Sequence, residues 1–520
     1  MRPGLVRLLG KRVANGSALA KGFVTLLIVA VVFLPIARGL ASGMFQVSTP
    51  AQRAEELLAQ LTPEERVGQL VMVTFTGTQV DPGTAIYELI VTHHIGGVVL
   101  SAAKDNFVDA PDTARAAWEL NRTLQMVDWM ASQEPLAGSL SEGQTLPNFI
   151  PLFIAVAQDG DGYPSDQLLS GLTALPNPMA IGATWQPDLA ERVGLILGKE
   201  LSALGFNLLL GPSLDLLELP KPESPGDLGT RTFGGDPFWV GEMGRAFIRG
   251  VHLGSQNRLA VVAKHFPGHG GSDRLPEEEV ATVRKSLEQL KQMELAPFFA
   301  VTGGATNPES TTDALLNSHI RYQGFQGNIR ATTRPISFDP QAFAQLMSLT
   351  PFATWRQDGG VVVTDDLGSR AVRRFYDPTG ISFNARLIAR DAFLVGNDLL
   401  YLGDFIEPGD PDAYTTISRT LSFFAQKYRE DPAFAQRVDE SVLRLLTLKF
   451  KLYGTFTLDA VLPPEEGLNV LGQGNEATFL VASHAATLIS PPPEDLESSM
   501  PAPPDLQDRI VFLTDTYTAV

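Results

Sequence analysis

Lysine, histidine and aspartate side chains stand directly behind two short apolar runs of this 520-residue chain. The stretch VVAKHFPGHG ends its apolar run in Lys264 and His265, and the stretch VVVTDDLG ends its run in Asp365 and Asp366. Ammonium and imidazole groups donate hydrogen bonds to hydroxyl or acyl oxygens. A carboxylate at the end of a buried strand is held rigidly in place. These four residues are therefore candidates for chemistry.

The same pattern recurs behind three more apolar runs. The polar residues behind all five runs are Gln158, Asp159 and Asp161; Ser213 and Asp215; Lys264 and His265; Asn317, Ser318 and His319; and Thr364, Asp365 and Asp366. If the runs are parallel strands of one barrel, their carboxyl ends form one rim, where barrel proteins carry their active sites. The sequence therefore predicts a functional site at that rim.

The elements that position these residues are short and buried. Eight apolar runs, most of them rich in Val, Leu or Ile and without strict alternation, predict strands buried on both faces. They are Leu70–Phe75, Gly97–Leu100, Leu152–Val156, Asn207–Leu210, Ala260–Ala263, Ala314–Leu316, Val361–Val363 and Asp398–Leu402. Helix-like segments separate most of them; the clearest, 187–204, repeats leucine and valine at spacings of three and four. This rhythm predicts an α/β fold, a (β/α)8 TIM-type barrel over residues 50–455, with a doubly wound open sheet as the alternative.

The two ends of the chain differ from this core. Basic residues precede an uncharged apolar run from Gly22 to Ala37, so residues 1–41 are predicted to be a signal peptide or a membrane anchor. Either form places the remaining chain outside the cytoplasm, secreted or anchored to the outer face of the membrane. Residues 456–508 are predicted to be a helical, proline-rich linker, and residues 509–520 the first strand of a possible second α/β domain.

Composition excludes several classes of partner and cofactor. The net charge is −18, which argues against nucleic acid as a partner. The chain has no cysteine, so disulfides and thiolate metal sites are excluded. His265 and His269 have no helical pairing with carboxylates, so no metal is predicted there, and a buried structural histidine is the alternative for both.

Four motifs in this order resemble the family 3 glycoside hydrolases, most closely the β-N-acetylhexosaminidase branch. They are HHIGGVVL (93–100), GTRTFGGDP (229–237), KHFPGHG (264–270) and VVVTDDLG (361–368). The resemblance extends from about Ala54 to Tyr453. It implies a carbohydrate substrate, a retaining mechanism with two carboxyl-type groups, and no metal or organic cofactor.

The resemblance also implies roles for individual residues. The family nucleophile falls on Asp365, and residues that hydrogen-bond sugar hydroxyls fall on Arg231, Lys264 and His265. His319, on the same rim, is predicted to contact the substrate as well. A helix N-cap is the alternative role for Asp365, and Asp366 is a second candidate for that cap.

Two departures from the family pattern affect the prediction. The branch carries an Asp-Ser-His triplet whose His is the acid/base, and at equal loop length the triplet falls on Leu275-Pro276-Glu277. We therefore expect a glutamate of 277–279, first of all Glu277, to act as the acid/base, with a solvated acidic loop as the alternative. The family's sugar-binding Asp after the third strand falls on Ala157, so Asp159 or Asp161 is expected to take its place.

The leading functional prediction is a retaining exo-β-glycosidase that cleaves β-linked N-acetylhexosamine. A β-glucosidase or β-xylosidase is the alternative within the family, because the loop histidine is absent. A sugar-binding protein without catalysis is the alternative of a different class, and a structural barrel ranks last. No oligomeric state is predicted.

Overall fold

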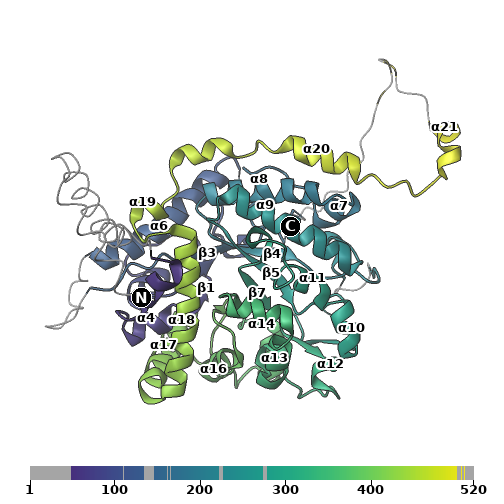
Figure 1. Cartoon of the computed structure of the whole chain (residues 1–520). Helices are drawn as coiled ribbons and strands as arrows, with labels where there is room; N and C mark the ends of the chain where they lie inside the picture. The colour runs from purple at the N-terminus through teal and green to yellow at the C-terminus, as the bar shows by residue number, and fades with distance from the viewer. Residues whose placement is uncertain are drawn as a thin grey trace, which may run out of the picture.

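The centre of the molecule is a closed barrel of eight parallel strands (Figure 1). The computed structural model describes residues 48–108, 110–133, 146–160, 162–163, 165–221, 227–272, 274, 278–500, 505, 507 and 509. The barrel strands are β1 (Val71–Val73), β2 (Gly97–Val99), β3 (Phe153–Val156), β4 (Leu208–Ser213), β5 (Ala260–Phe266), β7 (Ala314–Asn317), β9 (Val361–Thr364) and β10 (Leu400–Leu402). They pair in the order β10-β1-β2-β3-β4-β5-β7-β9, and a parallel bridge between Val363 and Leu399 closes β9 on β10.

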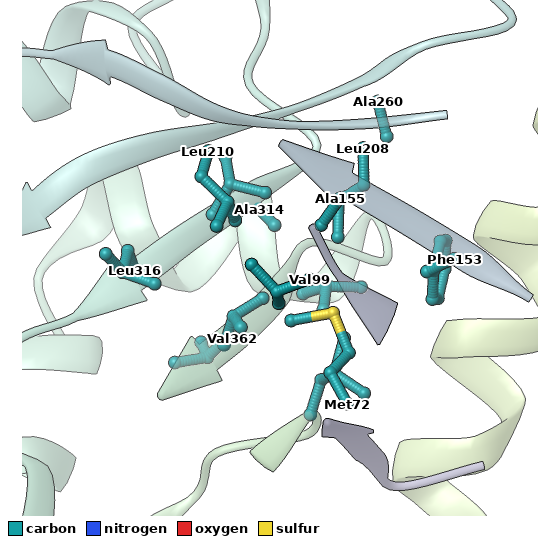
Figure 2. Packing of buried hydrophobic residues seen from close by; sticks show 14 of the residues in the cluster. Met72, Val99, Phe153, Ala155, Leu208, Leu210, Ala260, Ala314, Leu316 and Val362 are labelled. Carbon is teal, nitrogen blue, oxygen red and sulfur yellow. The ribbon is translucent and has the colours of Figure 1, made fainter. Parts of the chain in front are cut away.

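Each of the eight predicted apolar runs overlaps one barrel strand, and β4, β5, β7 and β9 extend one to three residues beyond their runs, so the barrel prediction is confirmed and the open sheet is wrong. Closure leaves every strand covered on both faces, which explains the continuous apolar runs. Figure 2 shows side chains from different strands, among them Met72, Ala155, Leu208 and Ala314, pointing toward one another inside the barrel. All four are buried, and together with the surrounding strands they form the core.

Helices form the outer layer of the barrel (Figure 1). The helices of the barrel region are α3 (Pro50–Leu58), α4 (Pro63–Gly68), α5 (Ala85–Val91), α6 (Thr113–Gln133), α7 (Pro178–Ala183), α8 (Pro187–Ala203), α9 (Pro237–Ser255), α10 (Leu287–Gln292), α11 (Leu295–Ala300), α12 (Gln323–Gln326), α13 (Pro340–Met347), α14 (Thr350–Gln357), α15 (Arg370–Tyr376), α16 (Ala385–Val395), α17 (Ala413–Glu430) and α18 (Pro432–Tyr453). Local signals set several of their starts: Thr62 and Ser286 form capping boxes, and Asp236 caps α9 ahead of a proline. The predicted helix at 187–204 is confirmed as α8.

A second, two-stranded parallel sheet was not predicted. It pairs β6 (Ala281–Val283) with β8 (Ile320–Tyr322), so it ties the loop after β5 to the loop after β7. Three-residue strands carry too little periodicity to be recognised in the sequence.

The segment after the barrel lies along its outer surface as far as α20 (Asn475–His484), which Figure 1 shows beside α8 and α7. The N–H of Gly472 donates to buried Glu200 of α8 at 2.9 Å, and the N–H of Gly474 donates to Thr173 Oγ1 at 2.9 Å. Short elements flank α20: α19 (Leu458–Val461), and α21 (Leu496–Ser499). Residues 456–484 are therefore docked on the barrel, while the proposed domain boundary near 455 stays a prediction.

The predictions for the chain termini fall on residues that are not described. Residues 1–47 lie outside the described part, and of 509–520 only Arg509 lies inside it. Within the described part, no helix is both long and apolar enough to cross a bilayer.

A buried ion cluster holds the end of the barrel opposite the rim. Asp398, just before β10, is fully buried and accepts hydrogen bonds from Val362 N at 3.0 Å, Ser441 Oγ at 2.8 Å and Arg356 Nη2 at 2.9 Å. Arg437 adds a contact at 3.3 Å. Burial opposes ionisation, but these guanidinium groups hold the pKa of Asp398 well below its usual range. The cluster joins α14, α18, β9 and β10.

Candidate active site

Lys264 and Asp159 form an ion pair across the rim between β5 and β3. Lys264 Nζ lies 2.7 Å from Asp159 Oδ2 and donates to the carbonyl of Leu210 at 2.9 Å. Side chains alternate along a strand, so Lys264 continues the inward-facing positions of β5 that begin with Ala260, which Figure 2 draws. Both charged groups are buried. The structure thus brings two predicted site residues together.

A second carboxylate organises the two histidines of the KHFPGHG loop. Asp215, after β4, is fully buried; its Oδ2 lies 2.7 Å from His265 Nδ1 and accepts from Ser213 Oγ at 2.9 Å. Its Oδ1 accepts from the N–H of His269 at 2.6 Å. Burial opposes ionisation, but His265 holds the pKa of Asp215 well below its usual range. Asp215 therefore favours the tautomer of His265 that carries a proton on Nδ1, and it fixes the orientation of the ring.

Asp365 is held by two hydrogen bonds at the end of β9. Ser318 Oγ, behind β7, donates to Oδ2 at 3.1 Å, and the N–H of Asp366 donates to Oδ1 at 2.9 Å. The residue is 7% exposed, so its carboxylate is anchored at the rim with a small accessible surface. A carboxylate fixed in this way is positioned to attack an electrophilic carbon.

His319 does not fit the predicted role of contacting the substrate. It is fully buried, with Nδ1 2.8 Å from Ser337 Oγ and Nε2 3.0 Å from the carbonyl of Asp366. The adjacent Ser318 reaches Asp365 directly. His319 therefore supports the turn that carries the aspartates from behind, because its ring nitrogens are used by the protein.

Neither Asp365 nor Asp366, the two candidates for the cap of the next helix, caps it. Ser369 caps α15, accepting from the N–H of Val372. The Asp366 carboxylate instead accepts from the N–H groups of Gly368 and Gly403, both at 2.8 Å, and so joins the ends of β9 and β10. Burial, with Asp365 and other carboxylates nearby, raises the pKa of Asp366 to about 6 despite these donors.

The raised pKa predicts a pH-dependent effect of Asp366→Asn. The unfolded-state pKa is about 3.9, so the folded chain binds the proton more tightly. The free energy of unfolding therefore falls as the pH rises from about 4 through 6. Above about pH 6 the destabilisation caused by the ionised Asp366 carboxylate is fully present. Asparagine keeps the acceptor oxygen without the charge. The Asp366→Asn variant should therefore have a free energy of unfolding about 1–3 kcal/mol higher than the parent at pH 7.5, and the gain should be much smaller at pH 4.5. Urea unfolding at both pH values measures this, and an equal gain at both would contradict it.

Arg231 lies on the rim loop between β4 and α9. Its Nε donates to the carbonyl of Leu228 at 3.0 Å, and its Nη2 donates to that of Asp227 at 3.1 Å. These bonds fix a half-buried guanidinium on its own loop. The structure places Arg231 on the rim without a direct bond to Lys264 or Asp365 among its described contacts.

The acidic loop after β5 is described only in part. Glu277 and Asp161, both predicted site residues, lie outside the described residues. Glu278 lies 3.1 Å from Arg370, the first residue of α15, and Glu279 pairs with Arg274. Since Arg370 is five positions beyond Asp365, the loop reaches the end of β9.

One organising residue carried no recognisable signal in the sequence. Asp166 accepts from the N–H groups of Asp159 at 2.6 Å, Gly160 at 2.8 Å and Gly162 at 2.9 Å, and so shapes the loop that presents Asp159. Burial raises its pKa. The partners are all within seven residues, yet an isolated aspartate in a loop matches no motif.

In the described part of the chain, no group of three metal-ligating side chains is present.

A closed parallel barrel with carboxylates and basic groups gathered at the carboxyl ends of its strands is the architecture of a TIM-barrel enzyme. The chain belongs to glycosyl hydrolase family 3: the family described as "Glycosyl hydrolase family 3 N terminal domain" matches residues 62–399. The family that the four motifs indicated is thereby confirmed.

Individual relatives agree with this assignment. The chain is 32% identical over 172 residues to a beta-hexosaminidase of Pseudomonas aeruginosa, which covers 33% of this chain and 47% of that protein. It is 27% identical over 312 residues to beta-hexosaminidase A of Pseudoalteromonas piscicida, and the match covers 57% of this chain and 46% of that protein. A family 3 beta-N-acetylglucosaminidase structure from Paenibacillus sp. superposes with a TM-score of 0.60 at 25% identity, covering 80% of this chain and 69% of that one. The chain spans about half the length of these curated relatives.

Proposed function

We propose that this protein is a retaining exo-β-glycosidase that releases terminal β-linked N-acetylhexosamine. The observation that carries the proposal is the anchoring of Asp365 by Ser318 and by the N–H of Asp366 at the rim of a family 3 barrel. The names of the relatives, beta-hexosaminidase and beta-N-acetylglucosaminidase, support the choice of sugar.

The proposed reaction has two steps. Asp365 attacks the anomeric carbon and forms a glycosyl ester, while an acid protonates the departing oxygen; water then hydrolyses the ester with the acid acting as base. We assign the acid/base to a glutamate of 277–279, first of all Glu277, since Glu278 and Glu279 already pair with arginines. Lys264 and His265, each oriented by an aspartate, are assigned to the sugar hydroxyls.

The absence of the branch's Asp-Ser-His triplet favours a second candidate, a protein that binds the same sugars without cleaving them. A β-glucosidase or β-xylosidase is the candidate within the enzyme class.

Hydrolysis of aryl β-N-acetylglucosaminide, β-glucoside and β-xyloside separates the sugars. The anomer released first, followed by NMR, tests retention. A dinitrophenyl leaving group departs with little help from an acid. If the protein hydrolyses only the dinitrophenyl glycoside, its general acid is defective. In that case Glu277→Gln should not change the rate at which the dinitrophenyl glycoside is hydrolysed. No turnover of any of them by folded protein would favour the binding protein.

Removal of the Lys264 ammonium should weaken both binding and turnover. A hydrogen bond from a charged donor contributes about 1.5–3 kcal/mol, so Lys264→Met is expected to lower kcat/KM roughly 10- to 100-fold. The measurement is steady-state kinetics on the aryl glycoside. The matched control is the double variant with Asp159→Asn: because the two groups form one pair, the double variant should lose little more than the worse single variant. Fully additive losses would show that the pair does not act as a unit.

The proposed location is outside the cytoplasm, supported by the basic residues and the apolar run within residues 1–41. Cell fractionation, with and without these residues, tests it: the full chain should be found in the membrane or secreted fraction, and a cytoplasmic full chain would contradict the proposal.

A further inference from the structure

Three aromatic residues form an exposed cluster outside the site described above. Trp185 is 57% exposed and Phe238 is 64% exposed, while Trp239 between them packs partly into the core. The rings of Trp185 and Trp239 meet edge to face with centroids 5.3 Å apart, and those of Phe238 and Trp239 with centroids 5.4 Å apart. Trp239 thus holds two exposed rings in defined orientations, which an isolated surface aromatic would lack.

The cluster lies on the same face of the barrel as the site. Trp185 lies between α7 and α8, and Phe238 and Trp239 lie in the first turn of α9. Since each helix follows its strand and returns toward the start of the next one, both helices begin at the rim end of the barrel. Figure 1 shows α7, α8 and α9 as neighbours. Gly182 of α7 approaches the loop of Arg231 so closely that a Cβ would lie 1.7 Å from the carbonyl of Phe233. The cluster and Arg231 therefore belong to one tightly packed unit.

The backbone at Trp185 is unfavourable for its side chain. Its φ is +57°, the left-handed region that bulky residues rarely adopt. Such backbone outliers concentrate at ligand clamps and active sites. The chain here combines a strained backbone with a large apolar ring left half in water, two unfavourable features at one residue. The left-handed conformation ends α7, since the N–H of Trp185 donates to the carbonyl of Gly182 at 3.0 Å, but glycine is the usual residue at such a position. The half-exposed ring is not needed for the packing of α7 or α8, whose buried contacts come from other residues, such as Ile181 and Val193.

We propose that this cluster binds pyranose rings of a glycan chain beyond the terminal sugar held at the rim. The apolar C–H face of a pyranose stacks on an exposed aromatic ring, and the cluster presents two such rings beside the Arg231 loop. The inference rests on the proposed function, since it extends the same substrate outward from the same rim.

The surroundings favour a neutral glycan over an anionic membrane surface. The helix starts that carry the rings hold two acidic residues, Asp188 in the first turn of α8 and Asp236 at the N-cap of α9, and one basic residue, Arg231, lies on the adjoining loop. Attraction to anionic lipid needs clustered Lys or Arg instead. Sugar hydroxyls, in contrast, donate hydrogen bonds to carboxylates.

The test measures binding separately from cleavage. The full chain carrying Asp365→Asn is titrated calorimetrically with a β-1,4-linked hexamer of N-acetylglucosamine and with the corresponding glucose hexamer. Adding Trp185→Gly removes the ring and suits the left-handed backbone, so this variant should be at least as stable and bind at least one hexamer about fivefold more weakly. Phe238→Ala should weaken binding similarly, and Trp185→Phe should restore most of it. Phe479→Ala, on α20 and 71% exposed, is the matched control and should bind as the parent does.

Equal affinity of the Trp185→Gly variant and its parent would overturn the proposal, as would absence of binding of both hexamers. A dimer in sedimentation that Trp185→Gly dissolves would also overturn it and assign the cluster to an interface between copies. Each of these results is distinguishable from failure of the proposed function, because turnover of the aryl monosaccharides by the chain with Asp365 intact reports on that function alone.

Discussion

Asp365→Asn is expected to lower the turnover of the aryl glycoside by about 10⁴- to 10⁶-fold, the range seen when a nucleophile or its partner is removed. Asparagine has the same shape, so its carbonyl can still accept from the N–H of Asp366 and its amide can donate to Ser318 Oγ. It cannot form the glycosyl ester. The loss should therefore appear in kcat, with the fold intact by circular dichroism.

The control for this variant is Asp366→Asn, the same change one residue further along the same turn. Asp366 is bonded to Gly368 and Gly403 and faces the end of β10, so its replacement should change kcat less than tenfold. Azide offered to Asp365→Gly should restore turnover and give a glycosyl azide of inverted configuration. Retention of more than about a tenth of the activity by Asp365→Asn would remove Asp365 from the mechanism.

Asp398→Asn is expected to cost about 3–5 kcal/mol of the free energy of unfolding, because it leaves buried guanidinium groups without their counter-charge. Arg356 and Arg437 both contact this fully buried carboxylate, which also accepts the N–H of Val362. Urea unfolding at pH 7 measures the loss. The folded-state pKa of Asp398 lies below the unfolded value of about 3.9, so its contribution is present above about pH 4 and is lost as the pH falls.

A surface pair provides the comparison for Asp398. Glu64 and Arg429 form an ion pair in which both side chains are about half exposed, so Glu64→Gln should change stability by less than about 1 kcal/mol. Similar losses from Glu64→Gln and Asp398→Asn would contradict the prediction, since burial would then make no difference. The kinetic constants of folded Asp398→Asn protein should match those of the parent, because the cluster lies at the end of the barrel opposite the rim.

The positions of the eight strands could be predicted because a parallel strand covered on both faces needs an apolar run, and each run is short and local. Asp365 and Lys264 were identified for a related reason: each directly follows such a run, and strand ends of a barrel share one rim. The start of α4 at Thr62 was equally local, since a capping box requires only residues three apart.

The partners of these residues could not be predicted. Asp159 and Lys264 are 105 positions apart, Asp215 and His265 are 50, and which atoms meet depends on the register of neighbouring strands. A shift of a strand by one residue would turn every side chain to the opposite face. The burial of His319 behind the rim was likewise missed, because a polar residue at a strand end has the same sequence pattern whether it faces the substrate or the turn behind it.

Local patterns in the sequence thus specified the strands, the order of the β/α units and the two strand ends that carry Asp365 and Lys264. The ion cluster of Asp398, the pairing of Lys264 with Asp159 and of His265 with Asp215, and the aromatic cluster around Trp239 depend on closure of the barrel. The physical reason is that hydrophobic periodicity and capping act over a few residues, whereas a salt bridge between distant segments exists only once closure has set their distance.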